Sequence, residues 1–158
     1  MKYRYALNHS RHGFTLIELL IVITVIAILS LIVIPALLSA SRRARESSMI
    51  ANLHQLRDAV ARFQADTGMY PTALTDVVAK DISQVRSPIP PTTFRGAYLS
   101  TDGGLQGEGA GLPPNPFIDQ KENDYTKHWK YDATTGTVSV PDSLKDSTTC
   151  DGRRFNDL

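Results

Sequence analysis

Glu18 is an acid at the edge of the longest apolar run in this 158-residue sequence. From Leu19 to Leu38 only Thr24, Ser30 and Pro35 interrupt the run, which has about the length a helix needs to cross a hydrocarbon core. A carboxylate at such a position costs on the order of a few kcal/mol unless it finds a partner. It therefore requires either the positive end of the helix dipole in the first turn or a cationic partner.

A protease site directly before the run would supply such a cation. Arg11-His12-Gly13-Phe14 ends a short basic leader in a small, flexible residue. Cleavage between Gly13 and Phe14 would create a new positive amine one helical turn from Glu18. An ordinary secretory signal is the alternative, with a mature chain that begins near Ser41. Its apolar region should, however, be about 7–15 residues long, free of acids and followed by a small-x-small site.

The segment Gly13-Phe14-Thr15-Leu16-Ile17-Glu18-Leu19 resembles the processing motif of type IV prepilins and of the pseudopilins of type II secretion systems. Pro35 falls where that family has a helix-loosening proline. The resemblance implies that a prepilin peptidase cuts after Gly13 and methylates the amine of Phe14. It also implies that Glu18 neutralises the Phe14 amine of a neighbouring subunit during assembly. The similarity is strongest between Gly13 and about Pro71.

The same resemblance implies a structural subunit of a homo-oligomeric helical filament and not an enzyme. The subunit would be stored in the inner membrane as a single-pass protein, with its head in the periplasm or another extracytoplasmic space, and polymerised by an inner-membrane assembly platform. The orientation rests on the resemblance, because basic residues flank both ends of the span: Lys2, Arg4, Arg11, Arg42, Arg43 and Arg45.

The elements that position these residues begin with one long helix from Phe14 to about Ala65. After Ser41 the apolar pattern becomes one-sided, with a stripe formed by Ile50, Leu53, Leu56, Val60 and Phe63. Such a helix would be roughly 75–80 Å long at 1.5 Å per residue. We expect a kink or local melting at Pro35 and a glycine stop at Thr67-Gly68.

The chain is thereby divided into a basic leader (1–13), a transmembrane and assembly helix (14–40), an amphipathic continuation (41–67) and a loop-rich head (68–158). The fold class is α+β, with the long helix packed on a small antiparallel sheet. In the head we expect a short helical turn through Leu74 and Val77, a short strand at Ala97-Tyr98-Leu99, and Tyr70 as a packing residue.

A hairpin is expected near the C-terminus, with arms at 128–131 and 137–140 around a turn that holds Gly136. Trp129, Tyr131, Val138 and Val140 would either share the face that covers the helix or split between the two faces. The segments Tyr70-Pro71-Thr72 and Asn115-Pro116-Phe117, with this hairpin, are similar to pseudopilin-like heads.

Charge and cysteine content exclude some classes of protein. The formal net charge is +1, and removal of the leader makes it about −2, which argues against a dedicated nucleic-acid-binding module. The single cysteine, Cys150, cannot close a disulfide within the chain and is expected to be a surface or half-buried thiol. Many type IV pilins carry a C-terminal disulfide, so its absence favours a pseudopilin or a disulfide-free pilin.

No catalytic or metal-binding arrangement is apparent. The histidines His9, His12, His54 and His128 are scattered, and the glycines from Gly103 to Gly111 lack the lysine of a phosphate-binding loop. Major pseudopilins often bind calcium in a C-terminal loop. Here the tail acids are loosely spaced, so a solvated tail is expected instead; they are Asp142, Asp146, Asp151 and Asp157.

The sequence thus favours a major-pseudopilin-like subunit, supported by the missing disulfide, the Tyr-Pro junction and the 145 residues left after removal of 13. A pilin for adhesion, motility or DNA uptake is the alternative within the filament class. A membrane-tethered binding module, whose span only anchors the head, is the alternative from another class.

Overall fold

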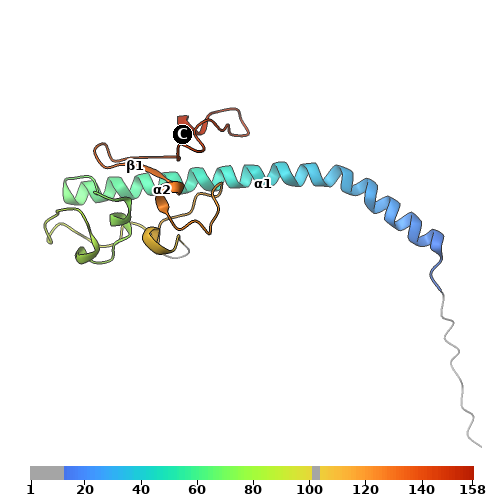
Figure 1. Ribbon diagram of the computed structural model, residues 1–158, viewed down its shortest axis with the longest axis horizontal. Coiled ribbons are helices and arrows are strands. Elements are labelled where there is room, and N and C mark those ends of the chain that lie inside the picture. The colour runs from blue at the N-terminus through green and yellow to red at the C-terminus, as the bar shows by residue number, and fades with distance from the viewer. Residues whose placement is uncertain (1–12, 101–103) are drawn as a thin grey trace, which may run out of the picture. The chain divides into compact units, whose positions relative to one another are not determined.

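The computed structural model describes residues 13–100 and 104–158, so the expected leader lies outside the described residues except for Gly13. The fold is α+β, with a long helix and a small antiparallel sheet (Figure 1). Helix α1 runs from Leu16 to Thr67 and belongs to two units, one up to Ala40 and one from Ser41 to Leu158.

The first unit consists of the apolar half of α1. Its large apolar side chains are between 44% exposed, at Val22, and 89% exposed, at Leu16. Thr24 and Ser30 donate their hydroxyl hydrogens to backbone carbonyls one turn earlier, at Ile21 and Ile26 among others, which satisfies these polar groups inside the helix. α1 continues through Pro35. A kink or local melting was expected at Pro35, and local melting is wrong. Proline removes one backbone donor but leaves the hydrogen bonds of the neighbouring turns intact.

In the second unit, α1 buries one stripe of side chains against the head. Leu53, Leu56, Val60 and Phe63 are buried as expected, Ile50 is half-buried, and Met49 and Ala59 widen the stripe. The helix ends at Thr67, directly before the expected glycine stop. The Thr67 hydroxyl donates to the Phe63 carbonyl at 2.7 Å, and Gly68 then adopts a φ of 78°, the left-handed conformation that favours glycine.

Loops joined by single helical turns cover this stripe: η1 (Leu74–Val78), η2 (Ile82–Gln84), η3 (Gly107–Gly109), α2 (Tyr125–His128) and η4 (Phe155–Asp157). The turn expected at Leu74 is therefore present. The strand expected at 97–99 is wrong. The amides of Tyr98 and Leu99 both donate to the Val77 carbonyl, at 2.9 and 3.2 Å, so this segment curls against η1 and cannot form an extended ladder.

The expected hairpin is present, with shorter arms. β1 (Lys130–Asp132) pairs antiparallel with β2 (Thr137–Ser139), and Tyr131 lies opposite Val138. His128 belongs to α2 rather than to the first arm. Trp129, Val138 and Val140 are buried, and Tyr131 packs half-buried against the same core. These four side chains therefore share the face that covers α1.

The tail after Pro141 is not simply solvated, contrary to expectation. Thr149 and Phe155 are buried, and Thr148 forms an antiparallel bridge with Arg154. The residues from Ser147 to Phe155 therefore form a closed loop, here called the C-terminal loop, held by the amide of Phe155, which donates to the Ser147 carbonyl at 3.0 Å.

Candidate processing and assembly site

The bond between Gly13 and Phe14 lies just before the first turn of α1. Residues 13–15 have no regular secondary structure, and Phe14 is 73% exposed. A Cβ atom added at Gly13 would meet no other atom within 4 Å. The chain itself therefore leaves this bond accessible, and no contact among the described residues requires a small residue at Gly13.

Thr15 and Glu18 cap the helix that follows. The Glu18 amide donates to the Thr15 hydroxyl oxygen at 3.2 Å, and the Thr15 amide donates to the Glu18 carboxylate at 3.5 Å. This reciprocal pair is a capping box, which satisfies two backbone donors at the start of a helix. Our sequence analysis missed the role of Thr15, although the Thr-x-x-Glu spacing predicts it.

Glu18 is exposed and surrounded along the chain by apolar side chains that are exposed as well. Its one hydrogen bond, at 3.5 Å, is longer than a typical N–H···O bond. The carboxylate can therefore accept a stronger, charged donor without giving up a buried partner. Pro35 is 17 residues further along α1, roughly 25 Å from Glu18 on an ideal helix, so the structure does not bring these two predicted residues together.

Among the described residues, one helix is long and apolar enough to cross a membrane, with a mean hydropathy of 3.1 over its most apolar window. None of that window is buried by the protein itself. The first unit therefore presents an uncovered apolar helix with a single carboxylate near its N-terminal end.

The C-terminal loop is attached to α1 by Glu46, which is buried. Its carboxylate accepts hydrogen bonds from the Cys150 amide at 2.8 Å and from Arg42 Nε at 3.3 Å, and Arg42 Nη2 donates to the Thr148 carbonyl at 2.9 Å. Burial opposes ionisation, but the hydrogen bonds from Cys150 and Arg42 outweigh it and hold the pKa of Glu46 below its usual value. The thiol of Cys150 is exposed, as expected.

A second group of bonds joins the hairpin to the rest of the head. Trp129 Nε1 donates to the Pro113 carbonyl at 2.7 Å, and Arg57 donates to the Val138 carbonyl at 3.0 Å. The Tyr131 hydroxyl donates to the Pro71 carbonyl at 2.6 Å, and burial raises the pKa of Tyr131. The bond of Tyr131 fastens the hairpin to the Tyr-Pro junction.

The tail acids do not converge on a metal-binding position. Asp142 pairs with Lys130 at 3.0 Å, and Asp151 pairs with Arg153 at 2.9 Å. Within residues 13–100 and 104–158, no three His, Cys, Asp or Glu side chains lie close enough together to hold a metal ion.

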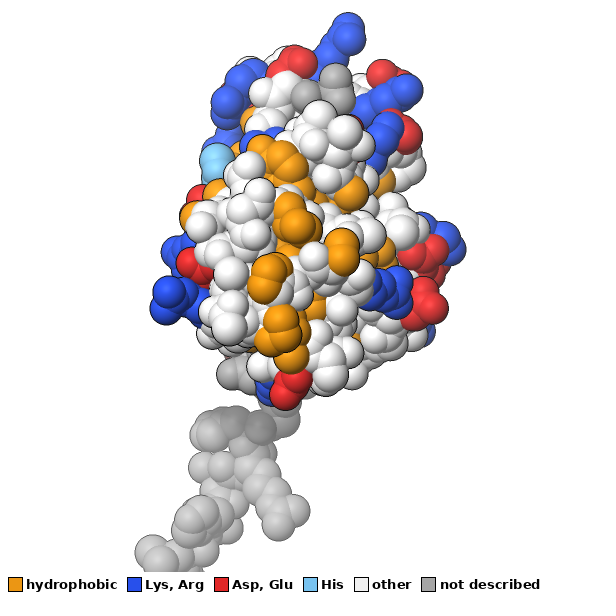
Figure 2. All heavy atoms as spheres, turned by 90° about the vertical axis from the view of Figure 1, so that its left-hand side faces the viewer, with side chains coloured by type: hydrophobic (Ala, Val, Ile, Leu, Met, Phe, Trp, Pro, Cys, Tyr) orange, Lys and Arg blue, Asp and Glu red, His pale blue; other side chains and the backbone are white. Residues whose placement is uncertain are grey.

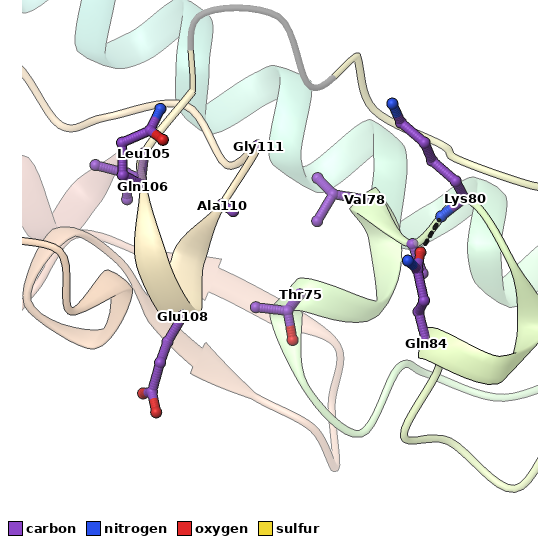
Figure 3. Close-up of a pocket in the computed structure, with 10 residues that line it drawn as sticks. Thr75, Val78, Lys80, Gln84, Leu105, Gln106, Glu108, Ala110 and Gly111 are labelled. Atoms are coloured by element: carbon purple, nitrogen blue, oxygen red, sulfur yellow. Dashed lines mark hydrogen bonds between the residues drawn. The ribbon is translucent and has the colours of Figure 1, made fainter.

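A cavity of about 490 Å³ lies between η1–η2 and the glycine-rich loop (Figure 3). Val78 and Leu105 line it together with Gln84, whose side-chain oxygen accepts a hydrogen bond from the Lys80 amide at 2.9 Å. The side chains of Lys80 and Glu108 point away from each other in Figure 3, so they do not form a charged binding site.

The amino-terminal segment matches a known family model, the prokaryotic N-terminal methylation motif, over residues 8–34. The chain is 47% identical over 58 residues to the type IV wide pilus major component PilA4 of Thermus thermophilus, which is 37% of this chain and 44% of that protein. It is also 28% identical over 128 residues to the type II secretion system core protein G of Vibrio cholerae, which is 81% of this chain and 76% of that protein.

The methylation motif and these relatives together support the type IV pilin and pseudopilin family for this chain. Another pseudopilin relative, the type II secretion system core protein G of Aeromonas hydrophila, is 28% identical over 87 residues, which is 55% of this chain. The chain spans 44% and 61% of the lengths of the Thermus pilin and the Aeromonas pseudopilin. No solved structure matches this pilin-like chain with comparable significance.

Proposed function

We propose that this chain is a structural subunit of a pilus-like filament, most like the major pseudopilin of a type II secretion system. The observation that carries the proposal is the position of Glu18: an exposed carboxylate, two residues into an exposed apolar helix and four residues after an accessible Gly13–Phe14 bond. The residues of the methylation motif and the pseudopilin relatives support it.

In this proposal, residues 1–13 are a leader, residues 14–40 form the membrane and assembly segment, residues 41–67 continue the helix, and residues 68–158 complete the head. Prepilin peptidase cuts between Gly13 and Phe14, and the Phe14 amine is then methylated. Before assembly the apolar segment spans the inner membrane, with the head outside the cytoplasm.

Assembly replaces the lipid around α1 with the apolar helices of other subunits. Glu18 then leaves its weak bond to Thr15 and pairs with the Phe14 amine of a neighbour. In a core of low dielectric an unpaired charge is strongly unfavourable, so the pair stabilises one axial stagger of the subunits over the others. Pro35 gives the segment a position at which it can bend in the filament, because it lacks one backbone hydrogen bond.

The test replaces Glu18 with Gln or Ala in the native cell. We expect the variant subunit to be inserted, cut at Gly13 and methylated, while the yield of sheared filaments falls at least tenfold. Glu108→Gln, the same chemical change at an exposed position of the head, is the matched control and should assemble normally. Normal filament yield from Glu18→Gln would contradict the proposal.

The N-terminus of the mature subunit gives an independent check. Sequencing or mass spectrometry should find Phe14 first, and Gly13 replaced by a bulky residue should leave the leader attached. A mature chain that begins at Met1 would indicate a tethered module, and one that begins near Ser41 would indicate a secreted protein.

A pilin for adhesion, motility or DNA uptake is the second candidate, and the 47% identity over 58 residues to a wide-pilus component favours it. Deletion of the gene separates the two functions. A pseudopilin defect should leave a secreted enzyme inside the cell envelope, whereas a pilin defect should abolish surface pili and leave secretion intact.

A further inference from the structure

Five arginines lie at the beginning of the second unit and on the C-terminal loop attached there. Arg42, Arg43 and Arg45 lie on the first turns of α1 in the second unit, and Arg153 and Arg154 lie on the C-terminal loop. The bonds of the C-terminal loop to Glu46 and Arg42 bring the two groups together. All five side chains are exposed, and Arg43 and Arg153 face a shared cavity of about 460 Å³. We call these five residues the arginine cluster.

The charge of the arginine cluster is not cancelled locally. Glu46 and Asp151 are the acids that pair with it, through Arg42 at 3.3 Å and Arg153 at 2.9 Å. Five arginines against two acids leave +3, whereas the other residues after Gly13 carry nine basic and fourteen acidic groups, a net of −5. Arg43, Arg45 and Arg154 take part in none of the ion pairs formed by the part of the chain that the structure describes.

The face of the head at the C-terminal end of α1 does not concentrate one sign of charge in this way. Figure 2 looks onto the head from the end where α1 stops, and hydrophobic side chains occupy the middle of that face. Lys and Arg side chains lie around its margin, interspersed with Asp and Glu. This face therefore lacks an excess of positive charge like that of the arginine cluster.

The position along the chain indicates the partner. The apolar run ends at Leu38, and Arg42 follows four residues later, about 6 Å further along a helix. This distance corresponds to the headgroup layer of a bilayer that contains the run. Arginines on the non-cytoplasmic side of a span disfavour the orientation with the head outside the cytoplasm. An attractive interaction of these arginines on that side would compensate for this cost. Guanidinium groups bind phosphate groups in a bidentate manner, and anionic lipids attract such clusters.

We propose that the arginine cluster binds anionic phospholipid headgroups of the leaflet next to the head while the subunit is stored in the membrane. Arg43, Arg45, Arg153 and Arg154 contact the phosphates, and Arg42 positions the C-terminal loop. The headgroups thereby hold the head against the bilayer surface until the subunit enters the filament. The inference rests on the proposed membrane insertion of the apolar segment, but not on the role of Glu18.

The test uses the full chain, processed at Gly13, in lipid nanodiscs with one subunit per disc. Cys150 is exposed, is unique in the sequence and lies in the C-terminal loop, so it can carry a polarity-sensitive fluorophore. We expect its emission to shift to the blue in discs with about one third phosphatidylglycerol relative to discs of phosphatidylcholine alone. About 1 M salt should remove the shift, because the Debye length then falls to about 3 Å.

Arg153→Gln/Arg154→Gln should reduce this lipid-dependent shift at least twofold, and the addition of Arg43→Gln/Arg45→Gln should abolish it. Arg62→Gln/Arg86→Gln removes the same charge from exposed positions outside the cluster and should leave the shift unchanged. Native mass spectrometry of the unlabelled protein gives a second measurement, in which the quadruple variant should retain at least tenfold less phosphatidylglycerol than the Arg62/Arg86 variant.

Equal emission in both lipids, together with equal lipid retention by all variants, would overturn the proposal. A shift that appears only in discs with two subunits would also overturn it, because the acidic surface of a second copy would then be the partner. Neither result would affect the filament proposal, which is decided separately by the N-terminus of the mature chain and the filament yield of Glu18→Gln.

Discussion

Three carboxylates of this pilin-like chain show how surroundings decide what one functional group does. Glu18 is exposed on an apolar helix and has a single weak hydrogen bond. Glu46 is buried and fastens the C-terminal loop. Asp76 is fully buried in η1, where it accepts hydrogen bonds from the Arg86 amide at 2.9 Å and the Ser87 hydroxyl at 2.6 Å. Only Glu18 is free to exchange its partner.

Gly136 is a second residue whose role follows from its surroundings. Its φ is 69°, and a Cβ atom there would overlap the ring of Tyr70. We expect Gly136→Ala to lower the free energy of unfolding of the head by about 2–4 kcal/mol, because backbone strain and steric overlap add. Gly152→Ala is the matched control, since its φ is 84° but its Cβ would meet no atom within 4 Å.

Thermal or denaturant unfolding followed by the fluorescence of Trp129 would measure both variants. The Gly152 variant should lose only about 1 kcal/mol. Equal losses would show that Tyr70 moves aside without cost and that only the backbone conformation matters.

At the scale of elements, α1 depends on its cap. Thr15→Ala removes the hydroxyl that accepts a hydrogen bond from the Glu18 amide. We expect this change to destabilise the first turn by about 1 kcal/mol. Amide hydrogen exchange at residues 16–19 in micelles should become about fivefold faster. Thr15→Ser retains the oxygen and should exchange at nearly the wild-type rate; rapid exchange in this control would indicate a different role for Thr15.

The C-terminal loop is the element whose attachment should depend on pH. The folded state holds the pKa of Glu46 below its usual value, so the unfolded state binds protons more readily as the pH falls. The stabilisation is therefore fully present above the pKa of the unfolded state, about 4.5, and is lost as the pH falls through the lower pKa of the folded state. The amide resonance of Cys150 in an NMR spectrum should report release of the loop in that range.

Glu46→Gln should release the loop at neutral pH in part, with a loss of about 1–3 kcal/mol, because the charged acceptor of the Cys150 amide becomes neutral. Glu108→Gln should not shift the Cys150 resonance at any pH. An unchanged Cys150 resonance in Glu46→Gln would mean that other contacts, such as the buried side chain of Phe155, hold the loop.

In the whole molecule, the two units require different surroundings: one is stable in water, and the other must be covered by apolar groups. The second unit, from Ser41 to Leu158, has its own core around Leu56, Phe63 and Trp129. The first unit exposes its apolar side chains and must be covered by lipid, detergent or other subunits. We therefore expect a chain that begins at Ser41 to be a folded, soluble monomer, whereas the chain that begins at Phe14 should aggregate when detergent is removed. Light scattering during detergent removal would measure this difference.

Much of the fold could be predicted from the sequence because it depends on short-range patterns. The span, the buried stripe of α1, the stop at Gly68 and the turn near Gly136 follow from apolar periodicity and from the φ angles that glycine tolerates. The processing bond and Glu18 were likewise predicted from neighbouring residues, and their roles stay predictions.

Other features depend on contacts between residues far apart in the sequence, and local patterns carry no signal for these. Glu46 accepts a hydrogen bond from Cys150, 104 positions later in the sequence, and Arg57 donates to the Val138 carbonyl, 81 positions later. The docked C-terminal loop and the arginine cluster exist because these long-range bonds form. Neighbouring residues suffice to specify the processing motif and the apolar helix, whereas the surroundings of Arg42 and Glu46 depend on folding, which brings residues more than 100 positions apart into contact.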